Sequence, residues 1–261
     1  MFGDRYEPVV VRFNDHSPQK PGQWFEPAMD KAREVLASAI AVPRLRSPGA
    51  RVGCRVMSQL FALTVGVRAT QETPGAFLGG LRVMAVDGTV LDVPDSQANA
   101  RVFGYPSSRP GTRAAFPKVR LVMLIEAGTH LIVDALICPY RIGERVRAKK
   151  LLRRVSEGMV LMWDRGLHSY AMVQATVATG CDYLGRVPAN VKFAVELVLD
   201  DGSYLSWIHP DSQSKKKGGT KICVRVIEYT IDSGQGQQTY RLITSLLDTA
   251  LFPALLNLGM N

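Results

Sequence analysis

Short apolar runs rich in β-branched residues alternate with helical patterns between residues 81 and 190, and this alternation leaves few possible folds. The runs predict five strands, and a turn signal at residues 127–129 joins two of them into a hairpin. Helical spacing of apolar residues at positions 141–154 and 168–180 separates the last three strands. This order is typical of an α/β sheet with helices on its faces.

The regions on either side of this core have different patterns. Residues 27–70 carry two stretches of helical spacing, which we interpret as helices of an N-terminal region. Residues 191–246 alternate apolar and polar side chains between turn signals, which predicts an all-β insertion or extension of the core. The expected organisation is an N-terminal helical region (1–75), an α/β core (76–190), an all-β segment (191–246) and a return to the core (247–261).

The chain is basic, with 32 Lys and Arg against 23 Asp and Glu and a formal net charge of +9, which favours a polyanionic partner such as nucleic acid. No apolar run approaches the roughly 20 residues of a membrane-spanning helix, and the first residues lack a leader pattern. We therefore expect a cytoplasmic protein with no membrane partner. The cysteines lack metal-ligand spacing, so we expect buried free thiols at Cys54, Cys138, Cys181 and Cys223.

Two aspartates each follow an apolar β-run, in "VMAVDGT" and "VLMWDRG". Asp164 lies 77 positions after Asp87, so their carboxylates meet only if the two strands are neighbours in the sheet. Such a pair can hold hard divalent ions, and two ions about 4 Å apart catalyse phosphodiester cleavage and joining. The alternative for each aspartate is a turn, because Asp-Gly between apolar stretches is a common hairpin signal and strand-end aspartates are often solvated.

Three longer stretches carry a family resemblance: "LRVMAVDGTVLDVPDSQANARVFG", "FPKVRLVMLIEAGTHLIVDALICPY" and "GMVLMWDRGLHSYAMVQATVATGCDYLGRVPAN". Over roughly residues 30–255, the chain resembles the DDE transposases of bacterial insertion sequences of the IS-four group. The resemblance implies an α/β, ribonuclease H-like mixed sheet with flanking helices, in which the all-β segment is an insertion after the second catalytic aspartate. It also implies that Asp87 and Asp164 are the first two acidic residues of a catalytic, metal-binding triad.

The same resemblance implies a cofactor and partners. The family uses two Mg²⁺ (or Mn²⁺) ions to cut and transfer DNA strands. Its partner is double-stranded DNA, both the terminal repeats of the transposon and the target, and it acts as a homo-oligomer on paired ends. Within the cytoplasm, such a protein is expected at the nucleoid.

Basic side chains are candidates for DNA contacts. Segment 141–154 has one acidic residue, Glu144, and as a helix it places three basic residues on one face: Arg147, Lys150 and Arg154. We interpret this face as tracking phosphates, with a plain solvated face as the alternative. Arg165, beside Asp164, is expected to contact a phosphate or to pair with a nearby acid. Lys216, in "SKKKGGTK", is expected in a flexible hairpin tip that touches the DNA backbone or only aids solubility.

Three further side chains near these motifs have bland interpretations that we favour. Trp163 and Trp207 are expected to pack in the core or on a sheet face, and stacking of Trp207 on a flipped base is the alternative. His168 is expected to cap a helix or face solvent, because chemistry with two metal ions needs no histidine base.

The third acidic residue of the family belongs to a Tyr-x2-Arg-x3-Glu-x6-Lys pattern that follows a phrase like "TSLLDTALFPA". In this chain the phrase continues as "LLNLGMN", without that pattern. Glutamates elsewhere lie in strand-like or turn segments, at Glu126, Glu157, Glu196 and Glu228. We therefore expect a C-terminally truncated DDE transposase that is inactive alone. The alternatives are a non-catalytic DNA-binding fragment, which occupies ends or inhibits full-length transposase, and an unrelated basic α/β protein.

Overall fold

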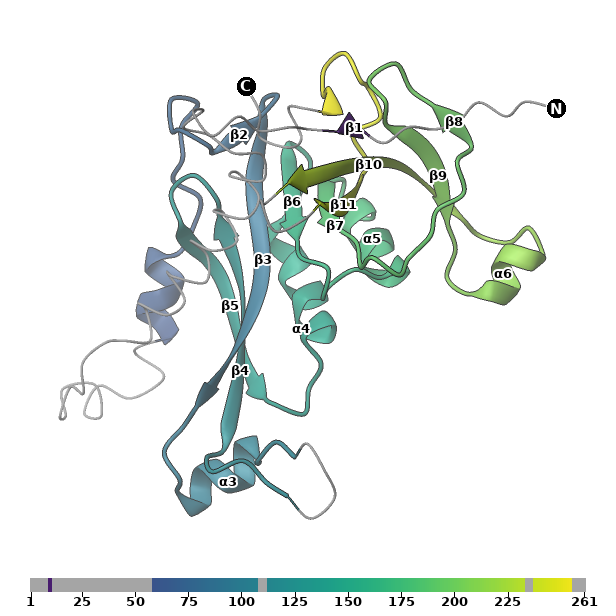
Figure 1. Cartoon of the computed structure of the whole chain (residues 1–261). Helices are drawn as coiled ribbons and strands as arrows, with labels where there is room; N and C mark the ends of the chain where they lie inside the picture. Colours follow the sequence, from purple (N-terminus) through teal and green to yellow (C-terminus); the bar gives the residue numbers. More distant parts are fainter. Residues whose placement is uncertain (1–8, 11–57, 108–111, 233–236, 255–261) are drawn as a thin grey trace.

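The computed structural model describes residues 9–10, 58–107, 112–232 and 237–254. Their strands form one eleven-stranded sheet, in which β1 (Val9–Val10) pairs with β10 and β2 (Phe77–Leu78) pairs with β3 (Figure 1). The remaining strands follow the order β5-β4-β3-β6-β7-β11-β10-β9-β8. They span β3 Leu81–Asp92, β4 Lys118–Glu126, β5 Leu131–Pro139, β6 Met159–Trp163, β7 Asp182–Arg186, β8 Leu197–Val198, β9 Tyr204–Ile208, β10 Ile222–Asp232 and β11 Gln237–Thr244.

Parallel strands form the centre of this sheet. β3 pairs in parallel with β6, and β6 pairs in parallel with β7. The hairpin of β4 and β5 extends the sheet antiparallel on one side, joined at the predicted turn of residues 127–129. The predicted mixed α/β sheet is confirmed. Its helices are α3 Gln97–Phe103, α4 Glu144–Leu151, α5 Tyr170–Val177 and α6 Ser212–Lys216, with a 3₁₀ turn at Leu152–Arg154 after α4.

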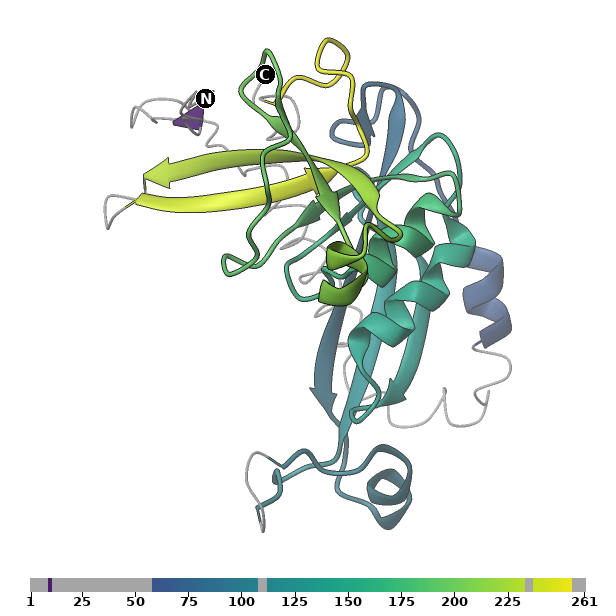
Figure 2. The ribbon, with the colours of Figure 1, turned by 90° about the vertical axis from the view of Figure 1, so that its right-hand side faces the viewer.

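Different parts of the chain cover the two faces of the central strands. Because side chains alternate along a strand, Met84 and Val86 lie on one face, in the apolar cluster formed with residues of α4 and α5. These two helices lie side by side on that face (Figure 2). Val83 and Ala85 lie on the other face and pack with residues of segment 246–254. The aspartate that follows Val86 therefore belongs to this second face.

The β-rich segment continues the core sheet. β11 pairs antiparallel with β7, with Leu242 opposite Arg186 and Thr244 opposite Leu184, so the segment extends the sheet rather than forming a separate one. Lys216 lies in the connection between the antiparallel strands β9 and β10, as predicted for a hairpin tip, but the predicted flexible loop is wrong because residues 212–216 form α6. Asp211 begins this helix by accepting the N–H of Ser214 at 2.7 Å.

The predicted N-terminal helices are only partly within the described residues. The first, at residues 27–42, lies outside them. The second is helical at residues 58–64 and ends earlier than the predicted residue 70, two residues before Gly66, which has a φ of 150°. Beyond it, the N–H groups of Arg68 and Ala69 each donate to buried Glu126 at 2.9 Å.

Sequence analysis did not predict α3, which lies at the end of the long β3–β4 ribbon, away from the rest of the sheet (Figure 1). The Ser96 hydroxyl caps this helix by accepting the N–H of Asn99 at 3.2 Å. None of its residues is buried, so it has no apolar face to leave a helical pattern in the sequence.

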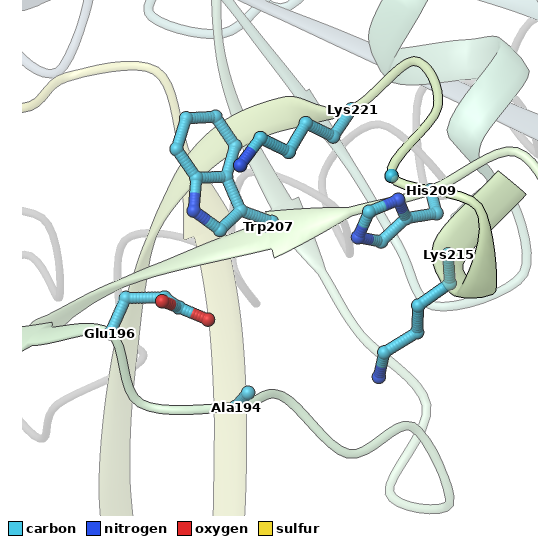
Figure 3. A pocket seen from close by; sticks show the side chains of 7 residues that line it. Ala194, Glu196, Trp207, His209, Lys215 and Lys221 are labelled. Carbon is cyan, nitrogen blue, oxygen red and sulfur yellow. The ribbon is translucent and has the colours of Figure 1, made fainter.

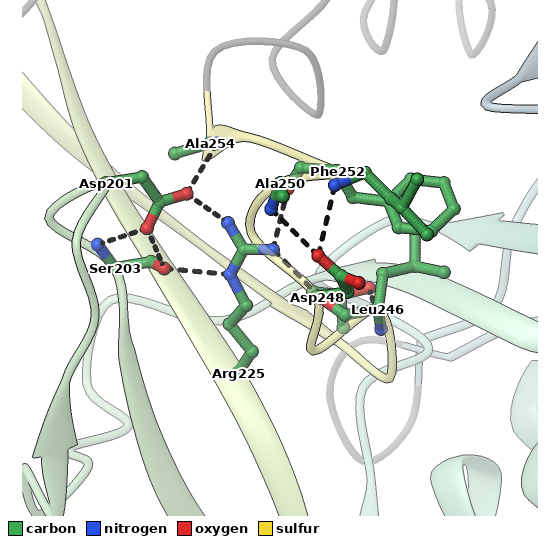
Figure 4. Close-up of polar contacts among 10 residues, drawn as sticks. Asp201, Ser203, Arg225, Leu246, Asp248, Ala250, Phe252 and Ala254 are labelled. Atoms are coloured by element: carbon green, nitrogen blue, oxygen red, sulfur yellow. Dashed lines mark hydrogen bonds and ion pairs between the residues drawn. The ribbon is translucent and has the colours of Figure 1, made fainter.

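A buried arginine ties the segment after β11 to the β-rich part of the sheet (Figure 4). Arg225 on β10 is fully buried and forms an ion pair with Asp201. Its Nη1 donates to the carbonyl oxygens of Leu246 at 2.9 Å and Phe252 at 2.7 Å. Asp201 also accepts the N–H of Ala254 at 2.7 Å. This Arg225 network holds the returning segment on the second face of the sheet.

Two remaining expectations concern thiols and membrane spans. Cys138 and Cys181 are buried free thiols as predicted, Cys223 is free but partly exposed, and Cys54 lies outside the described residues. Burial raises the pKa of the Cys181 thiol to about 12. Among the described residues, we find no helix of the length and apolar character that a membrane crossing requires.

Candidate active site

The two predicted aspartates come from neighbouring parallel strands at the same level. The β3–β6 pairing runs from Arg82 opposite Met159 to Val86 opposite Trp163, and Asp87 and Asp164 directly follow that last pair. Neighbouring strands lie about 4.8 Å apart. The condition that the sequence set for the two carboxylates to meet, that their strands are neighbours, is therefore fulfilled.

Asp87 lies inside a strand and not in a turn. It pairs with Met123 of β4, and β3 continues beyond it to Asp92, so the hairpin interpretation of Asp87-Gly88 is wrong. The strand also does not end at Asp87, as the pattern suggested; only its pairing with β6 ends there. The Asp87 side chain is buried, with 4% exposure, and lies on the same strand face as Val83 and Ala85.

Asp164 lies both at a strand end and in a turn, and its role as a metal ligand stays a prediction. It follows the last residue of β6 and begins a turn in which its Oδ1 accepts the N–H of Gly166 at 2.9 Å and of Leu167 at 3.3 Å. These bonds fix the orientation of a partly buried carboxylate at the end of a buried strand.

Glu144, which sequence analysis noted only as the one acid of a basic segment, lies beside these aspartates. Its Oε2 is 3.1 Å from Nη1 of Arg120 on β4. Burial raises the pKa of the Glu144 carboxyl and the Asp164 charge adds to the increase, whereas Arg120 and a backbone hydrogen bond from Gly88 oppose it. The local sequence gave no signal for this position, because it depends on how α4 packs on the sheet.

His168 follows the Asp164 turn and lies on the border of α5. Burial lowers the pKa of its imidazole to about 4, and the positive charge of Arg145 adds to the decrease. It is therefore neutral at neutral pH. The cap of α5 is the neighbouring Ser169, whose hydroxyl accepts the N–H of Met172 at 3.2 Å.

The basic segment forms α4 and the turn after it, as expected. Leu151 and Val155 are buried, which confirms the predicted core side of the helix. Lys150 and Arg154 are exposed and Arg147 is partly buried. Arg154 also lies 3.5 Å from buried Asp134, so one of the three predicted phosphate contacts has an internal partner. Whether this face meets DNA remains a prediction.

Lys216 lies on α6, and two neighbouring lysines line a hollow of about 270 Å³ beside that helix (Figure 3). Trp207 of β9 is 36% exposed there, and Nζ of Lys221 lies 3.9 Å from its ring centroid. Lys215 and His209 line the same hollow. Trp163, by contrast, is fully buried and stacks on Tyr183, as predicted for a core residue.

Arg165, the residue after Asp164, is exposed and lines a second hollow of about 240 Å³. Arg186 and Arg241 line it as well, and the guanidinium carbon of Arg186 lies 4.5 Å from the ring centroid of Tyr240. Arg241 pairs with Glu228 at 2.7 Å. The site thus combines two aspartates with an arginine-lined hollow next to one of them.

Known proteins with similar sequences identify the family of this chain. Residues 78–257 match the family described as transposase DDE domain, which is more than half of the chain. The chain belongs to this family. The predicted membership of the insertion-sequence DDE transposases is confirmed, and the alternative of an unrelated basic α/β protein is wrong.

Two relatives of this transposase domain come from Escherichia coli strain K12. The putative transposase InsZ is 25% identical over 181 residues, covering 66% of this chain and 60% of the relative. The transposase InsG of insertion sequence element IS4 is 24% identical over 208 residues, covering 78% of this chain and 46% of the relative. The chain thus spans about half to three fifths of the length of these relatives.

Two solved structures overlap with the domain more distantly. A piggyBac transposase synaptic complex with hairpin DNA has a TM-score of 0.39 at 12% identity, covering 64% of this chain and 33% of that one. Endonuclease V from Bacillus subtilis has a TM-score of 0.28 at 13% identity, covering 78% of this chain and 79% of that one. The family assignment is based on the sequence matches alone.

Transposase DDE domains generally depend on divalent metal ions, so the donor set of this domain can be tested against such an ion. Asp87 and Asp164 supply carboxylate oxygens at the same level of neighbouring strands, which is the donor chemistry that Mg²⁺ prefers. Among the described residues, no group of three or more His, Cys, Asp or Glu side chains could hold a metal ion. The carboxylates of the two aspartates match the donor chemistry of such an ion and would provide two ligands.

Proposed function

We propose that this chain is the catalytic region of an insertion-sequence transposase, which binds the ends of its element and cuts and transfers DNA strands. Asp87 and Asp164 would hold Mg²⁺ or Mn²⁺ as the first two acidic residues of the triad. The core around them would be ribonuclease H-like, and the protein would act as a homo-oligomer on paired ends.

One observation carries this proposal. The two aspartates directly follow the last residue pair of the β3–β6 pairing, although 77 positions separate them in the sequence. Family membership and this register support each other, because the family's chemistry needs two carboxylates at one place in the sheet.

The chemistry follows from what each residue can do. A divalent ion supplies charge stabilisation and an activated oxygen nucleophile for phosphodiester cleavage. Asp87 offers a buried carboxylate on a rigid strand, and Asp164 offers one whose orientation is fixed by two N–H donors of its own turn. His168 is neutral and does not need to act as a base.

DNA would be held by the basic side chains around this site. Arg165 and the arginine-lined hollow lie next to Asp164, so they can contact phosphates close to the cleaved bond. Arg147, Lys150 and Arg154 would contact the backbone further away, and Lys216 would do so from α6. The formal charge of +9 supports a polyanionic substrate.

A second function is favoured by the donor set itself. With two carboxylates and no group of three among the described residues, a polypeptide of these 261 residues would bind ends without efficient cleavage. Such a polypeptide would occupy transposon ends or inhibit a full-length transposase through mixed assemblies.

The test is a cleavage and strand-transfer assay with Mg²⁺ and Mn²⁺ on DNA that bears the ends of the element. It compares residues 1–261, the same chain extended by the family's C-terminal acidic helix, and the Asp164→Ala form of the extended chain. We expect cleavage only from the extended chain with Asp164 intact. Cleavage by residues 1–261 would contradict the inhibitor function, and equal cleavage by the Asp164→Ala form would contradict the catalytic assignment.

A further inference from the structure

The first turn of α4 contacts the chain beside both aspartates. Glu144 lies against Gly88, the residue after Asp87, and Arg145 bonds to Gly166, two residues after Asp164. Two consecutive residues of one helix thus reach Gly88, inside β3, and the turn that follows β6, from the strand face opposite to Asp87.

The Glu144 contact explains why a glycine stands in the middle of β3. A Cβ built on Gly88 would lie 2.7 Å from both Cδ and Oε1 of Glu144, closer than real Cβ atoms approach other atoms. Arg120 holds the other carboxylate oxygen at 3.1 Å, so the side chain is fixed from two sides. Asp-Gly is therefore a docking position for Glu144 rather than a turn.

The Arg145 contact acts on the Asp164 turn. Its Nε donates to the carbonyl oxygen of Gly166 at 2.7 Å, and the N–H of the same glycine donates to Oδ1 of Asp164 at 2.9 Å. The guanidinium is thus linked to the aspartate through one peptide unit. A change at Arg145 should move the turn that orients the Asp164 carboxylate.

An ordinary capping role does not account for these contacts. The N-cap of α4 is Gly143, which has no side chain to accept a bond. A glutamate in the first turn interacts favourably with the helix dipole, but that interaction requires no contact with Gly88 or Arg120. Glu144 is also partly buried, with its carboxylate between Arg120 and Gly88 and near the like charge of Asp164, so its contacts are with the sheet beside the two aspartates.

We propose that Glu144 and Arg145 are a positioning pair that sets the spacing of Asp87 and Asp164 for divalent-ion binding. This inference rests on the proposed function, because it assumes that the two aspartates hold the ion. The pair acts through Gly88 and Gly166 and does not itself contact the ion. Outer residues that orient metal ligands typically change metal affinity by about 10-fold to 100-fold when altered.

The test measures Mn²⁺ binding to the whole chain through the relaxation rate of water protons. This measurement needs no DNA and no activity. Arg145→Gln decides between positioning and simple charge, because removing a positive charge near a cation site should tighten binding if only charge matters. We expect binding about tenfold weaker instead. Arg145→Lys keeps the charge without the planar Nε donor and should resemble Arg145→Gln.

Gly88→Ala provides an independent arm without any change of charge. Its Cβ would displace the Glu144 carboxylate, and we expect about the same tenfold loss of Mn²⁺ affinity. Gly88→Ala and Glu144→Gln both act through the Glu144 carboxylate. The double variant Gly88→Ala, Glu144→Gln should therefore bind Mn²⁺ no more weakly than Glu144→Gln alone. Lys149→Gln, an exposed position on α4, is the matched control and should not weaken binding. Circular dichroism checks that each variant is folded, and Arg145→Gln carries the test alone if Gly88→Ala is not.

The outcomes separate this inference from the proposed function. If Asp164→Asn abolishes Mn²⁺ binding while Arg145→Gln binds as tightly as the unaltered chain or more tightly, the positioning role is wrong and the proposed function stands. An unchanged Mn²⁺ affinity in both Asp87→Asn and Asp164→Asn overturns the proposed function and the positioning role together.

Discussion

Individual glycines in this protein mark where two elements approach closely, and this applies on both sides of the candidate site. Gly88 leaves room for Glu144 of α4, and Gly185 of β7 leaves room for the indole of Trp163 on β6. The strand pattern of the sequence was enough to select Asp87 and Asp164 as candidates on two strands. It was not enough to predict Glu144 and Arg145, because their roles arise from the packing of α4 on β3 and on the turn after β6.

Gly185→Ala should destabilise the fold. Its Cβ would overlap Nε1 and Cε2 of Trp163, a fully buried ring that cannot move aside, and overpacking of this kind costs about 1–3 kcal/mol. Urea unfolding measures the difference. Gly219→Ala, whose Cβ would meet its nearest atom at 3.4 Å, is the control and should cost much less. Equal stability of the two variants would show that the Trp163 packing is looser than described.

Glu126 should make stability depend on acid pH. Burial opposes its ionisation, but hydrogen bonds from Thr129, Arg68, Ala69 and Arg82 outweigh burial and hold the pKa of the carboxyl below its ordinary value. A carboxyl whose pKa is lower in the folded state stabilises the fold at pH values above its ordinary pKa. This contribution is lost as the pH falls through the folded-state pKa.

The measurement is the urea midpoint of the unaltered chain and of Glu126→Gln, from about pH 7 to about pH 3. We expect the advantage of the unaltered chain to be largest near neutrality and to shrink in acid. An advantage that is constant over this range would contradict the assigned pKa direction.

At the level of elements, the strands were predictable and the shortest helices were not. The five core strands and α4 and α5 follow their hydrophobic patterns, because each buries one face. α3 and α6 bury no residue and begin at the caps Ser96 and Asp211. Their sequences therefore lack the periodic apolar residues that would predict a helix. The β7–β11 pairing joins residues far apart in the sequence, so local pattern alone left open whether the β-rich part was an insertion or an extension.

Loss of the Arg225 network should destabilise the returning segment, residues 246–254. Arg225→Met leaves Asp201 without its cation and two carbonyl groups without their donor, which costs about 3–5 kcal/mol for a buried pair. Amide exchange should accelerate in residues 246–254 more than in β3. Arg225→Met, Asp201→Asn should recover part of the stability, because no unpaired charge remains. A segment that stays protected in Arg225→Met would contradict its anchoring by this network.

For the whole molecule, basic charge and family membership lead to one expectation about binding. DNA affinity should fall steeply with salt, because each phosphate contact releases counterions. Lys150→Gln should weaken binding to all sequences and reduce the salt slope by about 1. Lys118→Gln is the control, since Lys118 already pairs with Asp92 at the far end of β4. An unchanged slope in Lys150→Gln would remove the α4 face from the DNA interface.

The most direct test of the account locates a divalent ion on the chain. Fe²⁺ bound in place of Mg²⁺, with ascorbate and peroxide, cleaves the polypeptide next to its ligands, and mass spectrometry maps the cuts. The account predicts cuts near Asp87 and near Asp164, suppressed by excess Mg²⁺ and lost together in Asp87→Asn. Cuts elsewhere, or cuts at Asp164 that persist in Asp87→Asn, would contradict the claim that these two strands form one metal site.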